Sequence, residues 1–118
     1  MKKLTEGFDP ACFVGRELET VLYASNLATL QFGDEVLITL LAEVALTSRT
    51  EGARRQDAPP WSSTRLPTLI GRLVESASAD PSGRLILQFD GGSTLEFVPD
   101  ESGYESFVVS VNGEEWVA

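Results

Sequence analysis

The chain has 118 residues and a formal net charge of −9, from 9 Lys and Arg against 18 Asp and Glu, and 42% of its residues are hydrophobic. This length and composition predict one globular domain over residues 1–118. The acidic excess argues against a nucleic-acid or membrane partner, because phosphate groups would be repelled, and no apolar segment reaches the roughly 20 residues of a membrane-spanning helix.

The first predicted unit covers residues 12–46. Apolar and polar residues alternate in segments that end at the turn-forming sequences "ASN" and "GDE". The segment "VLITLLAEVAL" (36–46) also has the apolar spacing of a helix, but its place in an internal repeat favours a strand. We therefore expect strands near 17–23, 27–32 and 36–41.

A connecting loop is predicted over residues 47–68, where Pro, Ser, Thr and charged residues are frequent. A loop of this length and composition offers little apolar surface to bury, so we expect it to be flexible or ordered by a partner. The sequence "LPTLIGRLV" at its end predicts a short helix or a turn.

The second predicted unit covers residues 69–118 and has the clearer pattern. In "RLILQF" the side chains of Leu85, Leu87 and Phe89 share one face of a strand. The turn sequences "DPSG", "DGGS" and "NG" separate the alternating segments, since their Gly, Asn and Asp residues tolerate positive φ. We expect strands at 74–79, 85–89, 94–98 and 105–111, and a final strand in "EEWVA".

The two units look like copies of each other. Gly15-Arg16 in the first corresponds to Gly71-Arg72 in the second, and "LQF" ends a predicted strand in both, at 30–32 and at 87–89. Matches in the same order at nearly equal spacing predict a duplication. The expected fold is all-β, with two related antiparallel β-units forming a sandwich or an open barrel.

Catalytic chemistry has few candidate residues in this chain. There is no histidine, and the single cysteine, Cys12, can form neither an intramolecular disulfide nor a zinc site. We expect no enzyme activity, no metal and no cofactor, and Cys12 as a small buried hydrophobic residue. One cysteine and the absence of a signal peptide after "MKK" favour the cytoplasm.

The C-terminal acidic residues are the candidate binding site. No Lys or Arg follows Arg84, and acidic and aromatic residues lie close together in "PDESGYE" and "NGEEW". Tyr and Trp are favoured at protein interfaces, although Tyr104 and Trp116 could also close the end of the core. The predicted partner-binding residues are Asp100, Glu101, Tyr104, Glu105, Glu114, Glu115 and Trp116, with Trp61 in the connecting loop.

The segments "GRLILQFDGGSTL" (83–95), "PDESGYESF" (99–107) and "NGEEWVA" (112–118) resemble a family of small uncharacterised bacterial all-β domains. That family has the pattern G-x-L-x-L-x-F, a Gly-containing turn, then Y-E-x-[WF]. This chain departs from it at Phe107, where Trp is commoner, and in its central loop, which is richer in Arg and Pro. The resemblance implies a likeness to immunity proteins of bacterial toxin systems.

These observations lead to two functional hypotheses. The first is a non-enzymatic immunity protein that neutralises a cognate bacterial toxin by covering its active site, with the acidic residues facing a basic surface. The alternative is a β module that binds a small molecule or peptide in a pocket between the two units. The oligomeric state is not indicated by the sequence.

Overall fold

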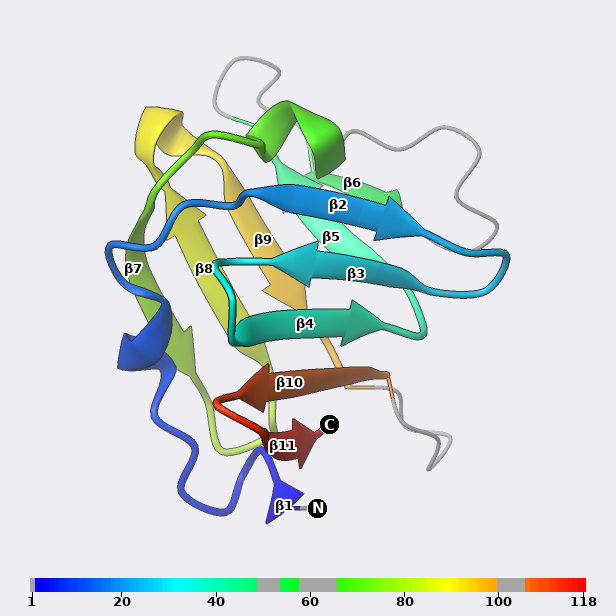
Figure 1. Ribbon diagram of the computed structural model, residues 1–118, viewed down its shortest axis with the longest axis vertical. Helices are drawn as coiled ribbons and strands as arrows, with labels where there is room; N and C mark the ends of the chain where they lie inside the picture. The colour runs from blue at the N-terminus through cyan, green and yellow to red at the C-terminus, as the bar shows by residue number, and fades with distance from the viewer. Residues whose placement is uncertain (1, 49–53, 58–65, 100–105) are drawn as a thin grey trace.

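A computed structural model describes residues 2–48, 54–57, 66–99 and 106–118, and these form two β-sheets packed face to face (Figure 1). The larger sheet has the order β1 (Lys2–Lys3), β11 (Glu114–Val117), β10 (Phe107–Val111), β4 (Val36–Leu40), β3 (Ala28–Gln31) and β2 (Thr20–Tyr23). The smaller sheet has the order β6 (Arg54–Asp57), β5 (Val44–Thr47), β9 (Thr94–Phe97), β8 (Leu85–Phe89) and β7 (Val74–Ala79). The predicted all-β fold is confirmed as a sandwich with open edges.

Helical structure in the described residues is limited to three 3-10 helices, η1 (Pro10–Phe13), η2 (Leu66–Leu69) and η3 (Asp90–Gly92). The short helix expected in "LPTLIGRLV" is η2. Among the described residues, no helix has the length and apolar character needed to cross a membrane.

Alternation of buried and exposed side chains explains why these segments form strands. In β4 the side chains of Val36, Ile38 and Leu40 are buried, whereas Leu37 and Thr39 are only partly covered. A period of two fits a sheet that faces the core on one side, so the helical alternative for 36–41 is excluded. The predicted strands are thus confirmed in the first unit, although β2 starts at Thr20 and not near residue 17.

Phenylalanine rings fill the space between the sheets. The ring of Phe32 lies 5.3 Å from that of Phe13 and 6.4 Å from that of Phe89, between ring centroids. Phe97 and Phe107 form a second pair at 5.5 Å. All five are almost fully buried, and each buried ring contributes about 1.5–3 kcal/mol through the hydrophobic effect.

The internal repeat is visible as paired hydrogen bonds where the two units meet. The amide of Gly15 donates to the carbonyl of Val74 and that of Gly71 to the carbonyl of Leu18, both at 2.8 Å. The two donors, Gly15 and Gly71, are 56 positions apart in the chain, and so are the two acceptors, Leu18 and Val74. Gly15 and Gly71 have φ of +83° and +90°, a backbone conformation that other residues adopt only with strain. The repeated Gly-Arg sequence is therefore structural.

The two predicted units do not correspond to one sheet each, because they exchange strands. β5 belongs to the first unit but pairs with β9 of the second, and β10 of the second unit pairs with β4 of the first. Each unit thus completes the other unit's sheet with its last strands. Sequence cannot reveal this exchange, since β5 and β10 have patterns that fit either sheet.

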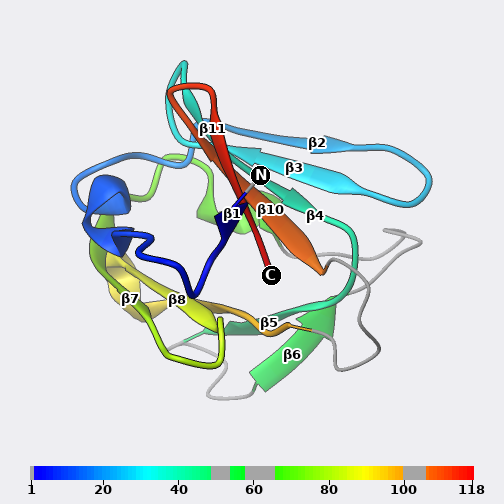
Figure 2. The same cartoon turned by 90° about the horizontal axis from the view of Figure 1, so that it is seen from below.

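The predicted connecting loop, 47–68, also needs correction. It contains β6, which pairs antiparallel with β5 at the edge of the smaller sheet. The sequence of β6, "RRQD", has none of the alternation that predicts a strand. Alternation is not required in an edge strand, because edge strands commonly contain charged residues. β1 was not predicted either; it pairs parallel to β11 at one edge of the larger sheet (Figure 2).

Candidate functional site

Only part of the predicted site falls within the described residues. Trp61, Asp100, Glu101, Tyr104 and Glu105 lie outside them. The other three predicted residues, Glu114, Glu115 and Trp116, are consecutive in β11.

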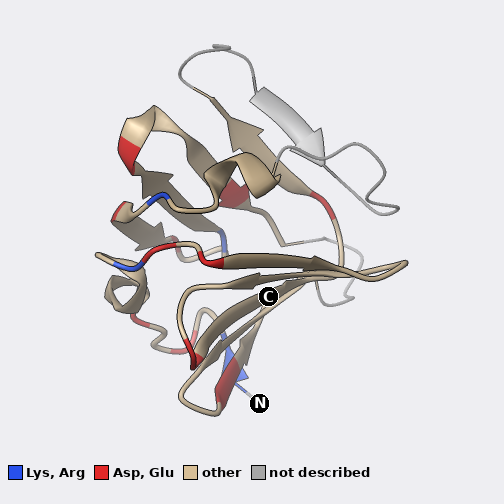
Figure 3. Ribbon diagram, turned by 45° about the horizontal axis from the view of Figure 1, so that its top comes forward, with Lys and Arg blue, Asp and Glu red and all other residues tan. Residues whose placement is uncertain are grey.

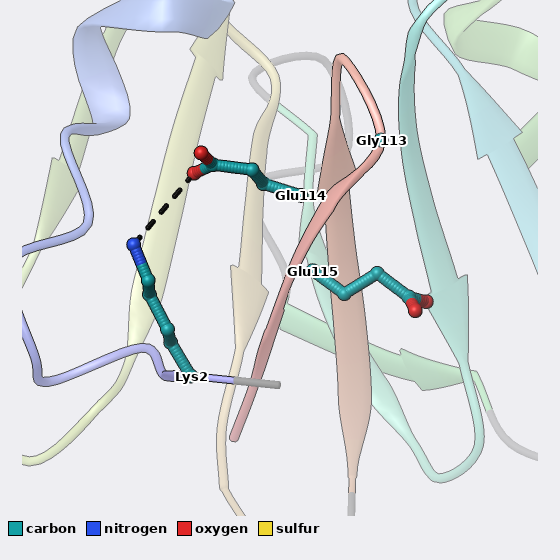
Figure 4. Close-up of a pocket in the computed structure, with 4 residues that line it drawn as sticks. All are labelled: Lys2, Gly113, Glu114 and Glu115. Carbon is teal, nitrogen blue, oxygen red and sulfur yellow. Dashed lines mark ion pairs between the residues drawn. The ribbon is translucent and has the colours of Figure 1, made fainter.

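Glu114 and Glu115 point to opposite sides of β11, as neighbouring residues of a strand must (Figure 4). The Glu114 carboxylate faces Lys2, with 3.9 Å between its Oε2 and Nζ. Both side chains are about 60% exposed, so solvent screens this ion pair and it contributes little stability. Glu115 pairs across the sheet with Ser110 and lies on the outer face.

Trp116 is partly buried and packs against the core. Its ring meets the ring of Phe8 edge to face, with centroids 5.2 Å apart, and the Lys2 Nζ lies 5.7 Å from its centroid. Trp116 therefore closes this end of the core, and only its exposed part could touch another protein.

Two turns meet at the end of the larger sheet where β11 begins. The turn between β3 and β4 contains Asp34 and Glu35, and the turn between β10 and β11 contains Asn112. The Asn112 amide donates to the Glu35 carbonyl at 2.9 Å, so the two turns are in contact. This brings Asp34 and Glu35, which are both exposed, onto the same end of the sheet as Glu114 and Glu115. Figure 2 shows the β3–β4 and β10–β11 turns side by side, and Figure 3 shows where acidic segments lie on the ribbon.

Glu19 extends this row of carboxylates to the start of β2. A methyl group placed on Gly33 would lie 3.5 Å from the Glu19 Oε2, which puts that carboxylate beside the β3–β4 turn. We call the five residues the acidic rim; they are Glu19, Asp34, Glu35, Glu114 and Glu115. Because the rim crosses from β2 to β11, four strand spacings place its ends roughly 19 Å apart.

Two basic side chains lie near the rim. Lys2 pairs with Glu114, and Arg16 lies beside Gly33. The Arg16 guanidinium donates to backbone carbonyls, at 2.8 Å to Cys12 and 3.4 Å to Phe32, and so is held against the fold. These two cations balance part of the rim's negative charge, and the rim remains acidic in sum.

In the smaller sheet, two acidic side chains form ion pairs with one arginine. Arg84 lies between Glu96, at 2.7 Å, and Asp80, at 3.1 Å, so its guanidinium balances both carboxylates. A hydrogen bond from the Ser82 hydroxyl and another from the Arg84 amide hold the pKa of Asp80 below its ordinary value. The acidic rim has no comparable arrangement among the described residues, and its charge is available to a partner.

The rim's shape favours contact with a surface over capture of a small ligand. A shallow hollow of about 280 Å³ opens at one end of it, lined by Lys2, Gly113, Glu114 and Glu115 (Figure 4). No three of the described Cys, Asp and Glu side chains are grouped closely enough to hold a metal ion. The carboxylates are spread along an edge, where they can attract a basic surface over a distance.

The sequence did not predict Glu19, Asp34 and Glu35 as residues of the binding site. They lie near β11 only because β4 pairs with β10, and the paired residues are more than 65 positions apart in the chain. The one available signal was the turn sequence "GDE". It indicates that two acidic residues lie at an end of a sheet, but it does not indicate which end.

The fold and the rim together define a small, acidic β-sandwich protein built from two related units. The chain belongs to a family of unknown function (DUF6188), whose family model matches residues 10–118. Neither a curated protein nor a solved structure matches the chain. The resemblance to an uncharacterised family is confirmed at that level, and the family's description names no activity.

Proposed function

We propose that this protein is a non-enzymatic immunity protein that binds a cognate bacterial toxin in the cytoplasm and covers its active site. The observation that carries the proposal is the acidic rim, in which five exposed carboxylates follow one end of the larger sheet. Toxins that act on nucleic acids or nucleotides present basic surfaces, and a row of carboxylates is complementary to such a surface.

The physical role of the rim is to attract and orient the partner. Exposed charges interact over about one Debye length, about 8 Å at physiological ionic strength, so the rim acts before the surfaces touch. Such steering raises the association rate more than it raises the affinity. The lasting contact then requires apolar groups, and the exposed part of Trp116 lies next to Glu115.

The alternative function, a small-molecule or peptide-binding module, requires a pocket between the two units. Phe32 and Phe89, one from each unit, stack in that position with centroids 6.4 Å apart. The hollow near Lys2 is open and lined by charged side chains, whereas ligand pockets are mostly apolar. We therefore favour the immunity protein.

Co-expression tests the proposal. The proposal predicts that a secreted protein with a toxic C-terminal domain is encoded immediately upstream of this chain's gene, and that domain is the probe. We expect this chain to restore growth of cells that produce the domain and to co-purify with it. Replacement of Glu35 and Glu115 by Lys should weaken both effects, whereas the same replacement of Glu43, which is exposed between β4 and β5 at the other end of β4 from Glu35, should not.

Failure of the chain either to restore growth or to bind the domain would contradict the proposal. Equal loss of protection in the rim variant and in the control variant would also contradict it, because the rim would then have no special role. Circular dichroism of both variants shows that the comparison is made between folded proteins.

A further inference from the structure

The outer face of the larger sheet is the side that points away from the core. In β4 the buried residues alternate with Leu37 and Thr39, which are partly exposed and point outward. The register of the sheet extends this side into two rows of outward residues. The row nearer the acidic rim consists of Thr20, Gln31, Leu37, Ser110 and Glu115, and the next row consists of Leu22, Thr29, Thr39, Val108 and Val117.

The middle of the outer face has no charge. The sequences of β2, β3, β4 and β10, which lie side by side in Figure 1, are "TVLY", "ATLQ", "VLITL" and "FVVSV", with no Asp, Glu, Lys or Arg. The charged residues of the two rows and the next strand lie at the border, with Glu115 on β11 and Lys3 beside Val117 on β1. The smaller sheet differs, because Glu96 in its middle strand β9 forms an ion pair with Arg84.

Apolar side chains are spread over this uncharged surface. Leu22 is 58% exposed, and Leu41, which continues the alternation of β4, is 37% exposed. Leu37, Val108 and Val117 are partly exposed between them. Four strand spacings by the four residues from 37 to 41 give a surface of about 19 Å by about 14 Å. Exposed apolar surfaces of this kind commonly mark protein interaction sites.

We propose that the toxin, once attracted by the acidic rim, is held on the outer face of the larger sheet; this rests on the proposed function and adds the apolar part of the interface. Protein interfaces have a centre with few charged residues and a polar border. The outer face provides such a centre, and the rim provides its border at one end. The complementary toxin surface is a flat apolar patch with Lys or Arg along one side.

Charge gives the reason for a basic partner and for its orientation. Glu115 belongs to the rim and also to the first row of the outer face, two strand spacings, roughly 10 Å, from Leu37. A partner seated on Leu37 therefore places its border against Glu115, where basic residues are favoured. A second copy of this chain would bring the same acidic border and a net charge of −9, so charge does not favour it.

Trp116 is on the other side of β11, where it pairs with the buried Val109. A partner that contacts Glu115 from the outer face thus finds its apolar contacts on β10 and β4, not on the Trp116 ring. This predicts that the outer face determines how long the complex lasts, whereas the rim determines how fast it forms.

Surface plasmon resonance with the toxic domain separates these two roles. We expect the double variant Leu37→Thr, Val108→Thr to dissociate at least about tenfold faster, with little change in association rate. Threonine is a good strand former, and a dissociation rate does not depend on the amount of folded protein. The matched control is Ile86→Thr, Val98→Thr, which makes the same kind of change at partly exposed and exposed positions of the smaller sheet and should leave the dissociation rate unchanged.

Cysteine labelling locates the contact directly. In a Cys12→Ser background, Leu37→Cys should react with iodoacetamide about tenfold more slowly when the toxic domain is present at about ten times its Kd, since about one molecule in ten is then unbound. Ile86→Cys should react at the same rate with and without the domain.

Unchanged dissociation of the Leu37→Thr, Val108→Thr variant, or equal labelling of Leu37→Cys with and without the domain, would overturn this proposal while the binding itself upholds the proposed function. If the unaltered chain does not bind the domain at all, both proposals fail. Labelling of Leu37→Cys that slows as the chain alone is concentrated would assign the outer face to a second copy and would also overturn the proposal.

Discussion

Replacement of Phe89 by Ala removes one of the two equivalent rings at the centre of the core. Phe89 is 2% exposed, and its ring stacks on that of Phe32 at 6.4 Å and 26°. Truncation of a buried Phe costs about 3–5 kcal/mol, because the lost hydrophobic transfer energy is joined by the cost of a cavity. For a chain of this length, that corresponds to a fall of roughly 12–20 °C in Tm.

Urea titration followed by circular dichroism measures this loss. Gln88→Ala is the matched control, since Gln88 is the exposed neighbour in β8 and its hydrogen bond with the Ser76 hydroxyl is on the surface. The control should cost at most about 1 kcal/mol. In the double variant with Phe32→Ala, the two losses should differ from their sum by about 0.5–1.5 kcal/mol, the coupling of the aromatic pair. A loss below about 1 kcal/mol for Phe89→Ala would refute the assignment of the core face.

Three further results are expected. Gly15→Ala and Gly71→Ala should each lower the free energy of unfolding by about 1–2 kcal/mol in urea titrations, and by similar amounts, because both glycines have positive φ at equivalent positions. Burial raises the pKa of the Cys12 thiol, so this thiol should react with iodoacetamide more slowly in the folded protein than in urea at the same pH. The contribution of Cys12 to stability should be present below its unfolded-state pKa and be lost as pH rises through its folded-state pKa. The Ser82 hydroxyl lowers the pKa of Asp80, so Ser82→Ala should raise that pKa in an NMR titration; the contribution of Asp80 to stability should be present above its unfolded-state pKa and be lost as pH falls through the lowered value.

The sequence predicted the local structure well because strand alternation and turn residues are local signals. The strand "LILQF" and the burial of Phe32 and Phe89 follow from period-two patterns and from the repeat. The strand exchange could not be predicted, because it depends on which distant edges β5 and β10 meet. β6 was missed because its residues are polar, as those of an edge strand can be.

The candidate site was predicted less completely for the same reason. Glu114 and Glu115 are close in sequence, but strand geometry sends their side chains to opposite faces. Asp34 and Glu35 are distant in sequence, and a single contact between turns brings them to the same end of the sheet. Sequence separation is thus a poor guide to which carboxylates share a surface in a β-sandwich.

The most direct test of the acidic rim as a binding surface is the association rate with the toxic domain, measured by surface plasmon resonance. Ionic strengths of about 0.01 M and about 1 M change the Debye length from about 30 Å to about 3 Å. We predict that the unaltered chain associates at least about tenfold more slowly at high salt, and that the Glu35→Lys, Glu115→Lys variant is slow at low salt as well. An association rate that depends neither on salt nor on these two residues would contradict the account.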